Sequence, residues 1–225
     1  MSTSSQATAA GIDVGADRLH LVVLDAALEV RSATVLDPGD THGFHSWMAS
    51  LAPGSTVAID GPDGPSSAPH RDDLTLAPKW RTARGCEVAL GQQRGIWVSW
   101  ATPERWDEMA PWMQVASGLF TALRSCAHIP LETYPHAVFR TLIGTRPPKK
   151  TSALGISARV DALRGAGVTE PTLAMWSHDA LDAAAAALVA AHHRAGTAEP
   201  VRDATDGTAV WLPPRPSVSQ SVIRR

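Results

Sequence analysis

The chain has 225 residues, 44% of them hydrophobic, which is enough to bury a substantial core in one large domain or two small ones. Its 20 basic and 22 acidic residues give a net charge of -2, so it lacks the overall positive charge of a high-affinity duplex binder, and any contact with nucleic acid must be local. Two cysteines without metal-ligand spacing exclude a zinc site and a disulfide scaffold.

Residues 1–10 lack the basic and apolar segments of an export signal, and no apolar stretch reaches the ~18 residues that span a bilayer. We therefore expect a cytoplasmic protein without membrane contact. Residues 1–9, rich in Ser, Thr and Ala, are predicted to be a disordered tail.

Short apolar stretches alternate with turn signals from residue 10 to residue 37, a pattern that predicts three antiparallel strands in a meander. Residues 40–51 have the apolar spacing of a helix, with Asp40 or Thr41 as its N-cap. The segment STVAID predicts a fourth strand, which ends at Asp60 and leads into a loop rich in Gly, Pro and Ser.

The second half of the chain is predicted to be mainly helical. A short strand ends near Glu132, and a hairpin around Asp206-Gly207 closes the fold. The predicted helices cover residues 81–94, 103–127, 135–143, 151–166 and 177–193.

The order of three strands, a helix and a fourth strand is the opening of a ribonuclease-H-like layout. We therefore predict an α/β fold with a mixed sheet, its first three strands antiparallel, flanked by helices. No repeat or composition break divides the chain, so residues 10–213 are predicted to form a single domain and residues 214–225 a flexible tail.

The helix predicted over residues 177–193 is apolar nearly all round, and Asp182 interrupts it. A buried carboxylate is costly unless it pairs with a cation, binds a metal or takes up a proton. Asp179 lies three residues earlier on the same face, where either a site role or first-turn charge behind a Ser177 N-cap explains it. Asp182 lies one turn further along the helix, so first-turn charge does not explain it.

Acidic residues also follow three predicted strands, at Asp13, Asp60 and Glu132. Asp13 or Asp60 alone is more typical of a turn. Together they indicate a site, because open α/β sheets bind ligands at the carboxyl ends of their strands. Carboxylates gathered there are suited to Mg²⁺ or Mn²⁺, which would clamp a phosphoryl group for attack by water.

Five motifs carry a resemblance to a known family. They are GIDVGADR, VAIDGPDG, RGCE, LETYPHA and HDALDAAAAALVA, in that order along the chain. The chain resembles, from Gly11 to Pro213, the domain-of-unknown-function 429 family of predicted nucleases with a ribonuclease-H-like fold. Its HDALDA motif is also similar to the last catalytic segment of RuvC-type Holliday-junction resolvases.

The resemblance implies that Asp13, Asp60 and Asp182 are catalytic metal ligands, with Asp179 as a helper. Glu132 matches the family's glutamate before Tyr-Pro, and we include it among the catalytic candidates. Three further sets are implied substrate-binding residues: Arg84 and Glu87 in RGCE, the pair Lys149 and Lys150, and Arg159 beyond them.

Four tryptophans, Trp97, Trp100, Trp106 and Trp112, either stack on unpaired bases or pack in the core. His178 either transfers protons beside the metals or lines the helix start.

The sequence thus predicts a metal-dependent nuclease whose substrate is nucleic acid or a nucleotide. The alternatives are a non-catalytic binding protein with this fold and a sugar-kinase or actin-like phosphotransferase. GIDVGAD also resembles the first phosphate loop of that last class, but no second phosphate loop follows.

Overall fold

The structure is a computed structural model that describes residues 8–216. Most of the tails predicted over residues 1–9 and 214–225 therefore lie outside the described residues, and the first strand already begins at Ala9. The elements in chain order are β1 (Ala9–Val14), β2 (Leu19–Leu24), β3 (Val30–Leu36), α1 (Thr41–Ser50), β4 (Thr56–Asp60), α2 (Pro78–Arg81), α3 (Gly85–Arg94), η1 (Trp106–Glu108), α4 (Pro111–Ser125), β5 (Ile129–Thr133), α5 (Pro135–Ile143), α6 (Ala153–Gly165), η2 (Leu173–Met175), α7 (His178–Arg194), β6 (Glu199–Arg202) and β7 (Ala209–Leu212).

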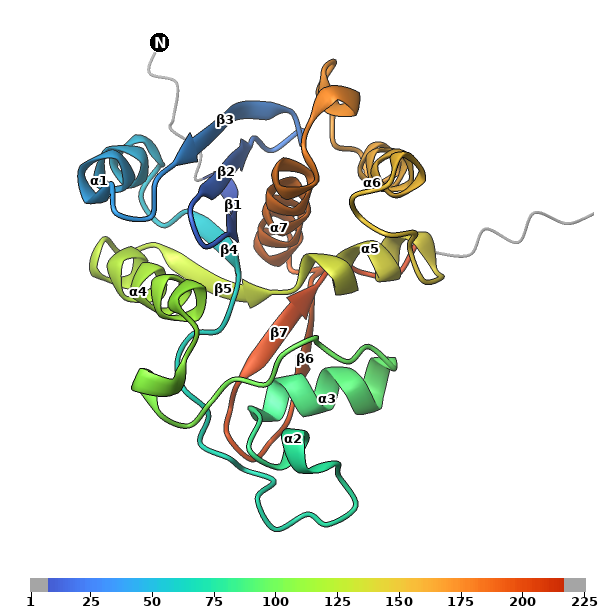
Figure 1. The fold of residues 1–225 in the computed structure, drawn as a ribbon. Coiled ribbons are helices and arrows are strands. Elements are labelled where there is room, and N and C mark those ends of the chain that lie inside the picture. Colours follow the sequence, from blue (N-terminus) through green and yellow to red (C-terminus); the bar gives the residue numbers. More distant parts are fainter. Residues whose placement is uncertain (1–7, 217–225) are drawn as a thin grey trace, which may run out of the picture.

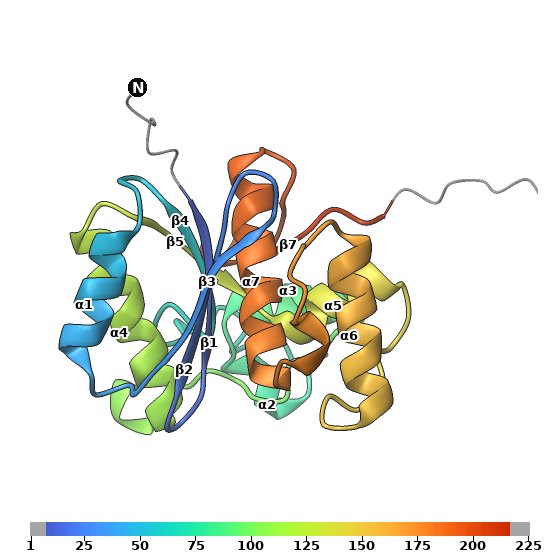
Figure 2. The same ribbon diagram turned by 90° about the horizontal axis from the view of Figure 1, so that it is seen from above.

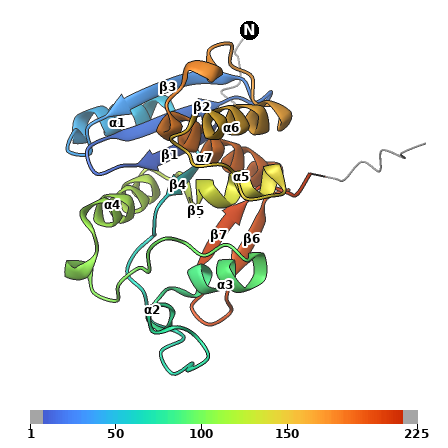
Figure 3. The same ribbon diagram turned by 45° about the vertical axis from the view of Figure 1, so that its right-hand side comes forward.

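Five strands form the main sheet in the order β3-β2-β1-β4-β5. β1, β2 and β3 are antiparallel, whereas β4 is parallel to β1 and β5 is parallel to β4. The predicted mixed sheet with three antiparallel strands is confirmed, and its order and directions are those of the ribonuclease-H-like layout. β6 and β7 form the predicted hairpin as a separate two-stranded sheet, which packs with α3 below the main sheet (Figures 1 and 3).

Helices cover both faces of the sheet. Figure 2 shows it nearly edge-on, with α1 and α4 on one face and α7 on the other, where α5 and α6 lie beyond α7. Successive strand residues alternate between these faces, so Ile12 and Ile59 pack with α1 and α4, whereas Ala58 packs on the α7 side. This alternation decides which strand residues reach the start of α7.

Two predicted helices begin later than expected. The helix predicted over residues 81–94 begins at Gly85, because Arg84 is its extended N-cap and Arg81 belongs to the short helix α2. The helix predicted over residues 103–127 begins at Pro111: residues 106–108 form a 3₁₀ turn, and Ala110 is extended before the proline. Within residues 8–216, no helix combines the length and the apolar character needed to cross a bilayer.

The backbone of α7 lies directly against β1 at Gly11. A Cβ atom at that position would lie 2.1 Å from the Ala183 carbonyl oxygen and 2.2 Å from the Ala187 backbone nitrogen. Residues 183–187 of α7 are all alanines, and all are buried. Small side chains on both elements therefore bring the helix close enough to the sheet for Asp182 to reach the end of β1.

We expect Gly11→Ala to destabilise the protein by about 1–3 kcal/mol, because the added methyl group meets backbone atoms that cannot rotate away. Thermal unfolding would measure this as a fall in Tm of roughly 2–4 °C for each kcal/mol.

The matched control is Gly118→Ala on the exposed side of α4, where an added Cβ has no neighbour within 4 Å. This substitution is expected to stabilise the protein by roughly 0.5–1 kcal/mol, since alanine favours helices over glycine. A Gly11→Ala protein as stable as wild type would contradict the close approach.

Candidate metal centre

Asp13 and Asp60 are register partners in the parallel pair of β1 and β4. Their neighbours Ile12 and Ile59 face α1 and α4, so the two carboxylates face α7. Asp13 is buried, and Oδ1 of Asp60 is a buried acceptor without a hydrogen-bond partner among residues 8–216. An unsatisfied carboxylate oxygen beside a second carboxylate is chemically suited to a hard cation.

The start of α7 brings two further carboxylates to this place. Ser177 Oγ accepts a hydrogen bond from the Ala180 backbone N–H at 3.2 Å, which makes it the N-cap. Asp179 then lies in the first turn, where its charge complements the helix dipole, and Asp182 lies buried in the second. β1, β4 and α7 lie side by side in Figures 1 and 3, which is how these distant segments share one site.

Burial and mutual repulsion raise the pKa values of these carboxyl groups. Burial, then the charges of Asp182 and Asp179, raise the pKa of Asp13 from 3.8 to about 8. Burial and the charges of Asp13 and Asp182 raise the pKa of Asp60 well above its usual value. Burial also raises the pKa of Asp182, against the lowering effect of Lys150 and Arg159. The cluster is therefore short of positive charge, which a divalent cation supplies.

Two basic side chains lie against Asp182. Lys150 Nζ is 3.2 Å from Oδ2 of Asp182 and 3.6 Å from Oδ1 of Asp179. Nε of Arg159 is 3.8 Å from Oδ1 of Asp182, and its Nη1 donates at 3.0 Å to the Gly155 carbonyl. Arg159 is buried and held by its own helix, whereas Lys150 is exposed and reaches in from the loop before α6.

His178 also belongs to this cluster. Its Nδ1 lies 2.5 Å from Oδ1 of Asp179, and one ligand atom each from His178, Asp179 and Asp182 lie within 4.8 Å of one another. These three residues are able to hold a metal ion. The sequence leaves His178 between proton transfer and a helix-start role and does not indicate this grouping. The only local signal for it is the four-residue spacing of His178 and Asp182, which brings their side chains to one face of the helix.

Glu132 belongs to a different set of contacts. Its register partner in β4 is Ile59, which faces α1 and α4, so Glu132 points away from the α7 face. Its Oε2 accepts from Arg84 Nη1 at 2.5 Å and from the Asp63 backbone N–H at 3.2 Å. Glu132 thus ties α3 to the loop that follows Asp60, and its predicted catalytic role stays a prediction.

Arg84 and Glu87 contact each other at the start of α3. The Arg84 backbone N–H donates to Oε2 of Glu87 at 3.2 Å, and the Thr102 backbone N–H donates to the same oxygen at 3.1 Å. Both side chains are buried. Their contacts stabilise the start of α3, and their predicted role in substrate binding stays a prediction.

Two hollows meet at the carboxylates. The first, which we call the basic pocket, has a volume of about 560 Å³, and its lining includes Trp100, Tyr134, His136, Arg146, Lys149 and Lys150. The second, the acidic pocket, has a volume of about 260 Å³ and is lined by Asp13, Gly15, Trp112 and Asp179, among others. Both are lined by Asp60, Trp100 and Lys150. The sequence leaves Arg146, beside Lys149 and Lys150, between phosphate binding and a solvated loop, and the structure places it in the lining of the basic pocket. Tyr134 did not emerge as a site residue, although it lies in the LETYPHA motif.

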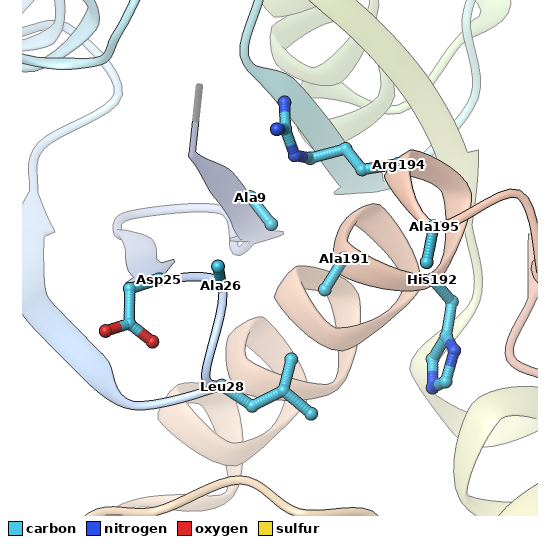
Figure 4. Close-up of a pocket in the computed structure, with 8 residues that line it drawn as sticks. All are labelled: Ala9, Asp25, Ala26, Leu28, Ala191, His192, Arg194 and Ala195. Atoms are coloured by element: carbon cyan, nitrogen blue, oxygen red, sulfur yellow. The ribbon is translucent and has the colours of Figure 1, made fainter. Parts of the chain in front are cut away.

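A further pocket of about 360 Å³ lies at the other end of the same elements (Figure 4). Ala9 at the start of β1 lines it, together with the turn after β2 and, at the end of α7, Ala191, His192, Arg194 and Ala195. Its carboxylate, Asp25, accepts hydrogen bonds from the Ala27 and Glu29 backbone N–H groups. These contacts occupy Asp25 within its own turn, so this pocket lacks the unsatisfied acidic groups of the first site.

Comparison with solved structures finds "Thermus thermophilus RuvC structure" at a TM-score of 0.46 and 16% identity. It also finds "T. thermophilus RuvC in complex with Holliday junction substrate" at a TM-score of 0.46 and 17% identity. Each alignment covers 91% of this chain and 99% of the other. A search of curated proteins gives no match. Residues 11–206 match the family described as "Protein of unknown function (DUF429)", the family that the sequence motifs resemble. The chain belongs to the DUF429 family.

Proposed function

We propose that the protein is a metal-dependent nuclease that hydrolyses phosphodiester bonds of nucleic acid with Mg²⁺ or Mn²⁺. The observation that supports the proposal is that Asp60, the register partner of Asp13, experiences the charges of both Asp13 and Asp182, while its buried Oδ1 has no hydrogen-bond partner among residues 8–216. A protein that only binds has no evident need to keep three like charges together at the cost of raised pKa values.

Asp13, Asp60 and Asp182 would hold the cation. His178 and Asp179, whose ligand atoms lie within 4.8 Å of one another and of one of Asp182, would lie beside it. When bound, such a metal lowers the pKa of a coordinated water and neutralises charge on the phosphate. Arg159 keeps Asp182 in place, because it is buried and anchored to the carbonyl groups of Pro148 and Gly155. Lys150 balances the charge of Asp182 and Asp179 and is exposed enough to contact a phosphate group.

We expect Asp60→Asn and Asp182→Asn each to lower hydrolysis by at least about 100-fold, because each removes a charge that holds the metal. The assay compares single-stranded, duplex and branched substrates with and without Mg²⁺. Asp161→Asn, on the exposed side of α6, is the control and should retain wild-type activity. Equal activity of wild type and Asp60→Asn, or activity in neither, would refute the nuclease proposal.

The raised pKa of Asp13 makes the stability of the metal-free protein depend on pH. The folded protein keeps a proton that the unfolded chain releases above about pH 4, so stability decreases as the pH rises from about 4 to about 8. Asp13→Asn removes this loss. We expect its Tm in EDTA to exceed that of wild type, by a difference that grows with pH across this window.

Mg²⁺ should raise the Tm of wild type more at about pH 8 than at about pH 6, since binding requires the ionised carboxylate. Asp13→Asn should respond little to Mg²⁺ at either pH, and Asp161→Asn should respond as wild type does. A Tm difference between wild type and Asp13→Asn that is constant with pH would contradict the buried, proton-binding environment of Asp13.

A further inference from the structure

The basic pocket has an aromatic wall. The ring centroids of Trp100 and Tyr134 lie 5.2 Å apart at 84°, and those of Tyr134 and His136 lie 5.7 Å apart at 45°. Trp100 also contacts Trp112 of the acidic pocket, with centroids 5.0 Å apart at 78°. Both Trp100 and Tyr134 are half-buried, so each is held by its neighbours and retains an accessible surface in the pocket. Aromatic surfaces of this kind bind the flat faces of unpaired bases.

Among residues 8–216, two basic side chains of the same pocket have no acidic partner. Lys150 and Arg159 lie against Asp182, but within residues 8–216 Arg146 and Lys149 form no ion pair. Both side chains are exposed where they line the pocket. They are therefore available to a phosphate group, and the acidic residues nearby belong to the metal centre.

His136 adds a neutral polar group to the aromatic wall. Burial and the charges of Arg159, Arg140 and Arg146 lower its pKa, which keeps the ring uncharged at neutral pH. A neutral imidazole offers one donor and one acceptor, a combination suited to the polar edge of a base. The volume of about 560 Å³ lies within the range of about 300–1,000 Å³ that is typical of sites for small ligands.

The position of the pocket connects it to the reaction. Asp60, Trp100 and Lys150 line both pockets, so a ligand seated in the basic pocket and extending into the acidic pocket passes the carboxylates. In a continuous duplex, pairing and stacking hold each base inside the helix, and a base enters a protein pocket only after it has left the stack. An unpaired base enters the pocket without the free-energy cost of breaking a base pair.

We propose that the basic pocket binds one unpaired nucleotide, with its base against Trp100 and Tyr134 and its phosphate toward Arg146 and Lys149. This inference rests on the proposed nuclease function and specifies its substrate class: the phosphodiester adjoining that nucleotide lies at the carboxylates, and a continuous duplex is a poor ligand. The nucleotide belongs either to a strand or to a free mononucleotide, and the experiment separates these sources.

Binding is measured in EDTA by fluorescence anisotropy of a labelled oligonucleotide, so that no hydrolysis is needed. The probes are a single strand, the blunt duplex of the same sequence and that duplex with one bulged nucleotide. We expect wild type to bind the single strand and the bulged duplex at least ~10-fold more tightly than the blunt duplex, as one stacked base contributes about that factor. Equal affinity for all three probes would overturn the proposal.

Two variants test the pocket itself. The double variant Arg146→Ala/Lys149→Ala changes exposed side chains only, and Trp100→Leu removes the shared ring. Each is expected to lose ~10-fold in affinity for the single strand and to leave binding of the blunt duplex nearly unchanged. Arg164→Ala, an exposed arginine in the last turn of α6 and not among the residues that line the pocket, is the matched charge control. If Trp100→Leu does not fold, the double variant decides, and binding equal to that of Arg164→Ala overturns the proposal.

A competition series identifies the source of the nucleotide. Displacement of the probe by mononucleotides at equal nucleotide concentration assigns a free nucleotide, and displacement by unlabelled single strand alone assigns a nucleotide within a strand. Either result supports the pocket, and displacement by neither overturns it.

The two proposals fail separately. Tight binding of the single strand without Mg²⁺-dependent hydrolysis of any substrate would refute the nuclease but not the pocket. Hydrolysis that depends on Asp60, with equal binding of single strand and blunt duplex, would refute the pocket but not the nuclease.

Discussion

The close contact between α7 and β1 determines the rest of the architecture. Gly11 has no side chain, and the alanines that face it are small, so the helix backbone rests on the strand backbone. This contact places Asp182 beside Asp13, and the parallel pairing of β1 with β4 adds Asp60. A larger residue at Gly11 would move the helix away from the sheet, and its carboxylate with it. The close packing of α7 on β1 therefore also determines where Asp182 lies in the site.

The charges in the site follow from that contact. The carboxyl groups of Asp13, Asp60 and Asp182 share a small volume, and of these three only Asp182 is ion-paired, to Lys150 and Arg159. Arg159 is buried and anchored, so it acts as a permanent part of the site, whereas Lys150 comes from an exposed loop and lines both pockets. Arg159 therefore orients Asp182, whereas the Lys150 side chain is free to exchange Asp182 for another negatively charged partner. A site of this kind trades stability for ligand affinity, as functional sites often do.

Much of this arrangement could be predicted from the sequence, because strand ends and helix period are local signals. Asp13 and Asp60 each stand at the end of an apolar strand, and an isolated charge in an apolar helix indicates Asp182. That Asp13 and Asp60 share one face follows from the register of β1 with β4. Glu132 shows the limit of such reasoning: it too ends a strand, yet its register with Ile59 turns it to the other face, where Arg84 is its partner. Register and partners depend on long-range packing, and the same holds for the ring contacts of Trp100 and Tyr134.

The position of α7 late in the chain has a consequence for how the site forms. Asp13 and Asp60 come from the first strands, whereas Asp182 arrives with the last long helix. Contacts between residues so distant in sequence form slowly, because their loop-closure entropy must be overcome before packing rewards it. The sheet can therefore pair while its acidic face is still open to water. The acidic cluster is complete only once α7 has docked on the sheet, and the electrostatic cost of the cluster first arises then.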